Sequence, residues 1–203
     1  MKKILLSIIA ALAFTLPAAA QSIIEDFESN SLEWTECTIK DAPGHTIISN
    51  GELILSSLKH EGSWNYDFHR AYCYAPLNNL NAFSIIANVS IRELDNQKYV
   101  GFIVNYRDDG NFYLFKITAW GVDFIRYENG KNVGDNWQRV AWSEKKNVKQ
   151  KWELRCDGET LSFFVNDMMI LKLKYMPIIY SGVGFYTDGE QKLVVEDIEF
   201  IQN

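Results

Sequence analysis

The sequence is poor in the residues that build metal centres and nucleophilic active sites. Its 203 residues include three cysteines and three histidines, and none of them stand at the spacing of a tetrahedral zinc site. No G-x-S-x-G motif is present, so the nucleophile elbow of a Ser-His-Asp hydrolase is missing. We therefore predict no catalytic residues, no metal site and no cofactor. One pair remains of interest, Asp67 with His69, because residues two apart on a strand share a face.

Positive charge and long apolar runs are also scarce. The formal net charge is −6 at pH 7, and it falls to −8 once Lys2 and Lys3 are removed with the first 20 residues. Nucleic acids and anionic membranes require a basic face, so the composition argues against both as partners. After residue 20, no apolar run approaches the roughly 20 residues that cross a bilayer. We predict no transmembrane segment.

The N-terminus has the three parts of a secretory signal peptide. A charged start at Lys2-Lys3 precedes an apolar run from Ile4 to Leu16, and Pro17-Ala-Ala-Ala20 forms a small-residue cleavage site. The apolar run is too short for a membrane anchor. We predict that residues 1–20 are a signal peptide and that residues 21–203 form a single β-sandwich domain. The protein is then exported, to the periplasm, the outer surface or the extracellular space.

Export makes disulfide bonds permissible, but three cysteines cannot all pair within one chain. Cys156 alternates with Trp152 and Leu154 in one apolar run, which predicts a buried thiol. Cys37 and Cys73 either pair with each other or remain free thiols.

Alternation of apolar and polar residues dominates the rest of the chain. The longest alternating run covers Phe83 to Ile91, and others begin at Val100, Tyr113, Trp152 and Leu161. A period of two residues indicates β-strands. Dipeptides typical of hairpin turns separate the runs: Asn50-Gly51, Asp109-Gly110, Asn129-Gly130, Asp157-Gly158, Asn166-Asp167 and Asp188-Gly189. The pattern predicts an all-β, two-sheet antiparallel sandwich with about ten strands or more and almost no helix.

The last predicted strand changes its alternation partway along. Leu193 and Val195 are apolar at odd positions, whereas Ile198 and Phe200 are apolar at even positions. Both pairs face the core only if one extra residue is inserted, so we predict a β-bulge at Glu196-Asp197. This acidic pair is assigned a structural role.

The order of the segments resembles that of a known group of domains. The segments that carry the resemblance are Glu25–Glu28, Gly51–Leu55, Tyr99–Tyr106, Asn111–Ile117, Tyr127–Lys131, Leu161–Asp167, Gly182–Tyr186 and Val194–Ile198. Over residues 23–202 the chain resembles bacterial concanavalin A-like lectin/glucanase jelly rolls, a group that includes laminin-G-like and 3-keto-disaccharide hydrolase-like domains. The resemblance implies a convex and a concave sheet, with ligands bound at the concave face. It also implies that a structural calcium ion is possible near the first and last strands, where Asp26 and Asp197 would supply oxygens.

Strand parity then gives a candidate ligand-binding face. If Phe83, Val100 and Tyr113 face the core, the residues at the alternate positions of their strands face outward. These three consecutive strands then present polar side chains on one outer face. An earlier segment adds the polar side chains of Asp67 and His69, and Trp120 supplies an aromatic platform at a strand end. The predicted ligand-binding residues are Asp67, His69, Asn88, Arg92, Asn105, Lys116 and Trp120. Amides and charges suit sugar hydroxyls, and an indole suits the apolar face of a sugar ring, although an ordinary half-solvated sheet face would show the same parity.

The tryptophans divide according to their neighbours in the sequence. We predict that Trp34, Trp142 and Trp152 belong to the core, and that Trp64, Trp120 and Trp137, which stand beside turns, are exposed.

The resulting prediction is an exported, non-catalytic module that binds a glycan or polysaccharide. Two alternatives remain open at this point, because one fold hosts many activities. The first is a sugar-processing hydrolase on the same fold, and the second is a protein-interaction or envelope-structural domain.

Overall fold

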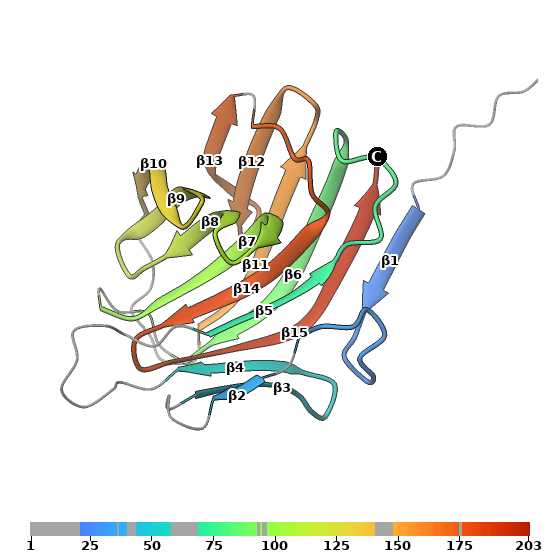
Figure 1. Cartoon of the computed structure of the whole chain (residues 1–203), viewed down its shortest axis with the longest axis vertical. Coiled ribbons are helices and arrows are strands. Elements are labelled where there is room, and N and C mark those ends of the chain that lie inside the picture. The colour runs from blue at the N-terminus through green and yellow to red at the C-terminus, as the bar shows by residue number, and fades with distance from the viewer. Residues whose placement is uncertain are drawn as a thin grey trace, which may run out of the picture.

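The chain folds into two antiparallel β-sheets that pack against each other (Figure 1). The computed structural model describes residues 21–35, 37–39, 44–57, 69–92, 94, 97–140, 148–174 and 176–203. Fifteen strands and no helix occur in these ranges, which confirms the predicted all-β sandwich. None of the described segments is therefore a helix that could span a membrane. Asp67, Trp64, Trp142 and the predicted signal peptide lie outside the described residues, so export stays a prediction.

The larger sheet has nine strands, in the order β13-β12-β11-β6-β15-β4-β3-β2 with β1 paired to β15. Its strands are β1 (Gln21–Glu25), β2 (Cys37–Ile39), β3 (Gly44–Ile48), β4 (Leu53–Ser57), β6 (Phe83–Ile91), β11 (Val148–Cys156), β12 (Thr160–Val165), β13 (Met168–Lys174) and β15 (Gln191–Gln202).

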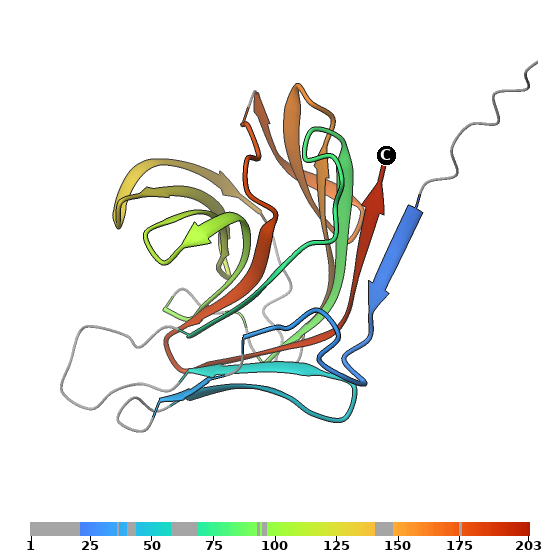
Figure 2. The same cartoon turned by 45° about the vertical axis from the view of Figure 1, so that its right-hand side comes forward.

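The smaller sheet has six strands, in the order β10-β9-β8-β7-β14-β5. They are β5 (His69–Tyr74), β7 (Tyr99–Asp108), β8 (Asn111–Ile117), β9 (Gly121–Glu128), β10 (Lys131–Arg139) and β14 (Gly182–Asp188). Figure 2 shows this sheet curving strongly through β8, β9 and β10.

The predicted turns lie where the sequence places them. Asn129-Gly130 and Asn166-Asp167 join neighbouring strands, and all four residues have positive φ values, between 49° and 76°. Asparagine, aspartate and glycine tolerate this conformation better than other residues. Asp188-Gly189 is different, because it connects β14 of the smaller sheet to β15 of the larger one.

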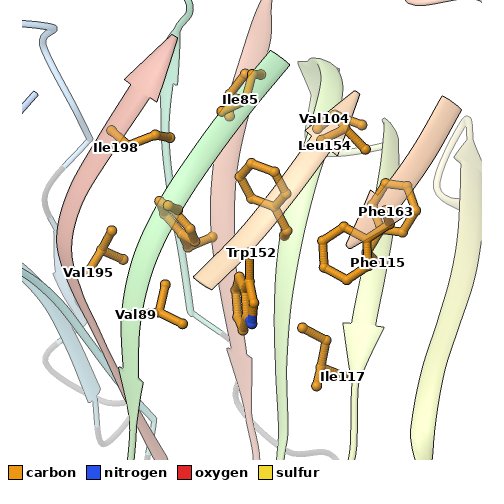
Figure 3. Close-up of a cluster of buried hydrophobic side chains, with 14 of the residues drawn as sticks. Ile85, Val89, Val104, Phe115, Ile117, Trp152, Leu154, Phe163, Val195 and Ile198 are labelled. Atoms are coloured by element: carbon orange, nitrogen blue, oxygen red, sulfur yellow. The ribbon is translucent and has the colours of Figure 1, made fainter. Parts of the chain in front are cut away.

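Large aromatic side chains from both sheets fill the space between them (Figure 3). Phe115 of β8 stacks on Phe163 of β12, with ring centroids 4.7 Å apart. The fully buried Trp152 lies 6.3 Å from Phe185, and Trp34 stacks on the same phenyl ring at 5.7 Å. The prediction that Trp34 and Trp152 are core residues is confirmed. Burial of each such ring contributes roughly 1.5–3 kcal/mol to the free energy of folding.

The predicted β-bulge in β15 is confirmed. Val195 pairs with Val89 of β6, but the next registered pair is Asp197 with Asn88, so Glu196 has no direct partner. Val195 and Ile198 are both fully buried in consequence.

The prediction that β6 and β7 contribute to one outer face is wrong. β6 lies between β11 and β15 in the nine-stranded sheet, whereas β7 lies between β8 and β14 in the six-stranded sheet. The segment that joins β6 to β7 crosses from one sheet to the other. The outward-facing side chains of these two strands therefore lie on opposite sides of the sandwich.

The predicted parity of β5 is also wrong. His69, Ala71 and Cys73 are buried and face the core, while Arg70 and its even-numbered neighbours face outward. The imidazole of His69 lies so close to Gly44 that a Cβ atom there would overlap it. Because Gly44 of β3 has no side chain, it leaves room for the inward-facing imidazole of His69.

Both cysteines whose side chains the structure describes are free thiols. Cys73 and Cys156 are buried, which confirms the prediction for Cys156. Since Cys73 is free, it is not paired with Cys37.

Candidate functional site

The outer face of the six-stranded sheet carries an unusual concentration of aromatic and charged side chains. One row of directly paired residues crosses all six strands, in the order Trp137, Asp123, Lys116, Gly101, Tyr186 and Arg70. Side chains of directly paired residues lie on the same side of a sheet. We call this surface, together with the outward residues beside the row, the aromatic face.

A cluster of opposite charges lies at the centre of the aromatic face. The Lys116 ammonium lies 3.7 Å from the centroid of the Tyr99 ring, a cation–π contact. Burial lowers the pKa of Lys116, and attraction to the carboxylates of Asp188 and Asp123 opposes that shift. The Lys116 ammonium therefore lies within the electrostatic influence of two carboxylates.

Asp188 is the most constrained member of this cluster. Its Oδ2 atom accepts a hydrogen bond of 2.9 Å from the Tyr186 hydroxyl, whose pKa is raised by burial and by the Asp188 charge. Its Oδ1 atom is buried and has no hydrogen-bond partner among the described residues. Unsatisfied buried oxygens are rare in folded proteins, and several other buried side-chain atoms of this structure share the property, among them Trp34 Nε1 and Thr187 Oγ1.

A strip of stacked rings runs beside the charged row. Tyr72 stacks on Tyr106 at 4.2 Å, Tyr106 lies 6.2 Å from Phe112, and Phe112 stacks on Tyr127 at 4.7 Å. The Tyr106 hydroxyl donates a 2.7 Å hydrogen bond to Asp109. Aliphatic side chains of β7, β8 and β9 complete this second apolar cluster, which is separate from the main core.

One corner of the aromatic face exposes two indole rings. Trp137 is 51% exposed and pairs with Asp123, while Trp120 is 48% exposed in the turn between β8 and β9. The guanidinium of Arg139 lies 6.0 Å from the centroid of the Trp120 ring. The predictions that Trp120 and Trp137 are exposed are confirmed; Trp137 belongs to the row that contains Lys116, and Trp120 follows at the end of the same strand as Lys116.

The predicted ligand-binding residues divide between several places. Lys116 and Trp120 lie on the aromatic face. Asn105 belongs to the same strand as Tyr106 but is buried, and its Oδ1 atom accepts hydrogen bonds from the backbone N–H groups of Ile179 and Tyr180, at 2.7 and 2.9 Å. Its carboxamide oxygen therefore anchors a loop and is not part of the candidate site.

Asn88 and Arg92 belong to the opposite side of the molecule. Asn88 donates a 2.8 Å hydrogen bond to Asp197 on the outer face of the nine-stranded sheet. Arg92 follows β6 and forms a 3.8 Å ion pair with Glu190. The prediction that these residues share one face with Lys116 is wrong, because β6 and β8 belong to different sheets. His69 is buried between β5 and β3, and Asp67 lies outside the described residues.

The sequence-based analysis allowed for a structural calcium ion near Asp26 and Asp197. Among the described residues, no group of three or more His, Cys, Asp and Glu side chains is placed so that it could hold a metal ion. Asp26 accepts a hydrogen bond from the Glu28 N–H group, and Asp197 accepts the one from Asn88.

Sequence reasoning missed Arg70, Tyr72, Asp123, Tyr186 and Asp188. The signal was present in β7 and β8, where apolar residues occupy both parities. A strand that is apolar on both sides indicates that its outer side is covered, and here the stacked rings provide that cover.

Comparison with known proteins identifies the fold. No family model matches the sequence, and no curated protein matches it. A β-glucanase of Bacillus licheniformis superposes with a TM-score of 0.62 at 11% identity, over 88% of this chain and 97% of that one. The carbohydrate recognition domain of Emp47p gives a TM-score of 0.62 at 11% identity, over 90% and 95% of the two chains.

A third solved structure, described with the endo-acting O-glycanases by which human gut bacteria initiate mucin breakdown, gives a TM-score of 0.61 at 10% identity, over 88% of this chain and 98% of that one. The chain thus has the jelly-roll fold of the concanavalin A-like lectin and glucanase domains.

Proposed function

We propose that this protein is a non-catalytic module that binds a glycan on the aromatic face. The observation that carries the proposal is the corner where Trp120 and Trp137 lie exposed beside Lys116 and Asp123. An indole offers a platform for the apolar face of a sugar ring, and charged groups beside it hydrogen-bond to the hydroxyls at the ring edge. The lectin and glucanase domains that share the fold support a carbohydrate ligand by analogy.

A sugar-processing hydrolase is the second candidate, because Asp123 and Asp188 are two carboxylates on one face. Glycosidases use a carboxyl pair in which one member delivers a proton to the glycosidic oxygen. Here the Lys116 ammonium interacts with both carboxylates, and Tyr186 already donates to one of them. This arrangement favours holding a ligand by hydrogen bonds over acid catalysis.

The test begins with a glycan array probed with the protein lacking residues 1–20, followed by calorimetric titration of the glycans that bind. Trp120→Ala and Trp137→Ala should each weaken binding by up to about tenfold, since an aromatic contact contributes up to about 1.4 kcal/mol. Neither change should lower the melting temperature appreciably, because both rings are half exposed.

Met168→Ala is the matched control. Met168 is a similarly exposed apolar side chain, at 54%, but it lies at the start of β13 in the other sheet, so its removal should leave affinity unchanged. Shortened products after incubation with a bound glycan would favour the hydrolase. Absence of binding to every glycan, or unchanged affinity in both tryptophan variants, would contradict the proposal.

A further inference from the structure

A cleft at the other end of the aromatic face has features of a second contact region. It lies along the outer edge of β5, has a volume of about 450 Å³, and is lined by Ser31, Leu32, Glu33, Thr35, Tyr72 and Tyr74. Tyr74 is 59% exposed, which is high for a tyrosine on a strand.

The outer wall of this cleft is held in place by specific hydrogen bonds. The buried carboxylate of Glu25 accepts them from the Ser31 hydroxyl at 2.6 Å and from the Leu32 N–H group at 3.1 Å. Thr35 is fixed to the strand itself, because its N–H group donates to the Tyr72 carbonyl at 3.0 Å and its hydroxyl accepts from the Tyr72 N–H group at 3.0 Å. A surface fixed in this way loses little entropy when a ligand binds.

The backbone of β5 adds polar groups to the cleft. Since Tyr72 directs its N–H and C=O groups toward Thr35, the alternation of an antiparallel strand directs those of Tyr74 to the same edge. β5 ends the six-stranded sheet at this side. A sugar seated against the Tyr74 ring would find a donor and an acceptor beside it.

The cleft is continuous with the aromatic face through Tyr72. This ring lines the cleft and also stacks on Tyr106, while Tyr74 lies edge-on to it at 6.4 Å. The two exposed ends of the surface, at Tyr74 of β5 and at Trp137 of β10, lie on the two edge strands of the six-stranded sheet. Five strand spacings of about 4.8 Å separate the two edge strands by roughly 24 Å, and Tyr74 lies four residues along β5 from Arg70 of the row, so several linked sugar rings are needed to reach from one end to the other.

The charges along this path select against acidic sugars. Glu33 is the charged residue among those that line the cleft. Arg70 is paired with Asp109 at 3.2 Å, and Lys116 lies beside two carboxylates. A uronic or sulfated sugar would therefore meet a carboxylate in the cleft and, at the centre of the face, cations that lie near carboxylates, while the Arg139 guanidinium beside Trp120 is a cation at the opposite end.

We propose that the cleft at β5 is a second binding region and that the ligand is a neutral oligosaccharide long enough to reach it from the Trp120–Trp137 corner. This inference rests on the proposed glycan-binding function and specifies its ligand class. Two linked contact regions make affinity grow with ligand length, because the second contact forms within the same complex.

The test is a calorimetric titration with neutral β-1,3-glucose, β-1,4-glucose and β-1,4-N-acetylglucosamine oligomers, from disaccharide to octasaccharide. The wild-type protein should bind the octasaccharide of one series at least about tenfold more tightly than its disaccharide. Tyr74→Ala should weaken octasaccharide binding by up to about tenfold, the loss expected for one aromatic contact. It should leave disaccharide affinity unchanged. Met168→Ala should change neither affinity.

The outcomes separate the two proposals. Binding that is independent of length, or octasaccharide affinity that Tyr74→Ala leaves intact, would overturn the second binding region alone. Equal or tighter binding of a polygalacturonate octamer would overturn the neutral ligand class. If no oligomer binds, the glycan-binding function fails as well.

Discussion

Single residues of this sandwich show how burial decides the chemistry of a side chain. Burial raises the pKa of the Cys73 thiol, and the nearby Glu25 carboxylate raises it further. Burial also raises the pKa of Cys156. Since the thiolate is the reactive form of cysteine, both thiols are protected by the fold.

We predict that a thiol reagent such as dithionitrobenzoate leaves Cys73 and Cys156 unmodified in the native protein at about pH 8, near the pKa of free cysteine. Both should react promptly in guanidinium chloride, with peptide mapping by mass spectrometry to locate the label. The denatured sample is the control for reagent activity. Rapid labelling of Cys73 in the native protein would show that β5 does not bury it.

At the scale of elements, β15 is the strand whose register tests the fold most sharply. The bulge at Glu196 turns Val195 and Ile198 toward the core, while Val194 faces outward and is half buried. The bulge itself is fixed on the outer face, where Glu196 accepts hydrogen bonds from the Ser90 hydroxyl at 2.7 Å and from Lys149 at 3.0 Å. These bonds hold the pKa of Glu196 below its usual value.

We predict that Val195→Asp lowers the free energy of unfolding by several kcal/mol, since an unpaired carboxylate in an apolar core is strongly unfavourable. Val194→Asp is the matched control, with the same substitution one residue away on the outer side, and should cost far less. Urea unfolding followed by tryptophan fluorescence measures both. Equal stability losses in the two variants would show that the register of β15 is wrong.

The sequence alone predicts the strands, the turns and the β-bulge correctly. It does not predict which of the two sheets each strand joins. The turn at Asn129-Gly130 and the bulge at Glu196 are visible because each depends on a few adjacent residues. The placement of β6 and β7 in different sheets depends on how distant strands pack, and alternation carries no such information.

The inward side of β5 was not predictable for a related reason. Its outward side carries Tyr72 and Tyr74, which are larger and more aromatic than the inward Ala71 and Cys73. Because large apolar residues are usually buried, the sequence predicts that Tyr72 and Tyr74 face the core. They face outward instead, because the outer face of this sheet is itself aromatic. Asp123 and Asp188 lie on β9 and β14, strands whose place beside the predicted face the sequence does not reveal.

The whole molecule has two outer faces of different character. On the nine-stranded sheet, charged and polar groups pair with each other, as Asn88 does with Asp197, around a depression of about 260 Å³. On the six-stranded sheet, stacked rings and a charged row lie between two exposed aromatic ends, Tyr74 and Trp137. The jelly-roll fold alone does not determine which face binds a ligand, but the distribution of aromatic side chains favours the six-stranded sheet.

Glycan binding on the aromatic face can be tested directly by following the tryptophan indole N–H signals by NMR while a glycan that binds on the array is added to the protein. The signals of Trp120 and Trp137 should show saturable shifts, and those of the buried Trp34 and Trp152 should remain nearly unchanged. Saturable shifts of the Asn88 side-chain amide with no change at Trp120 and Trp137 would place the ligand on the nine-stranded sheet and rule out binding on the aromatic face.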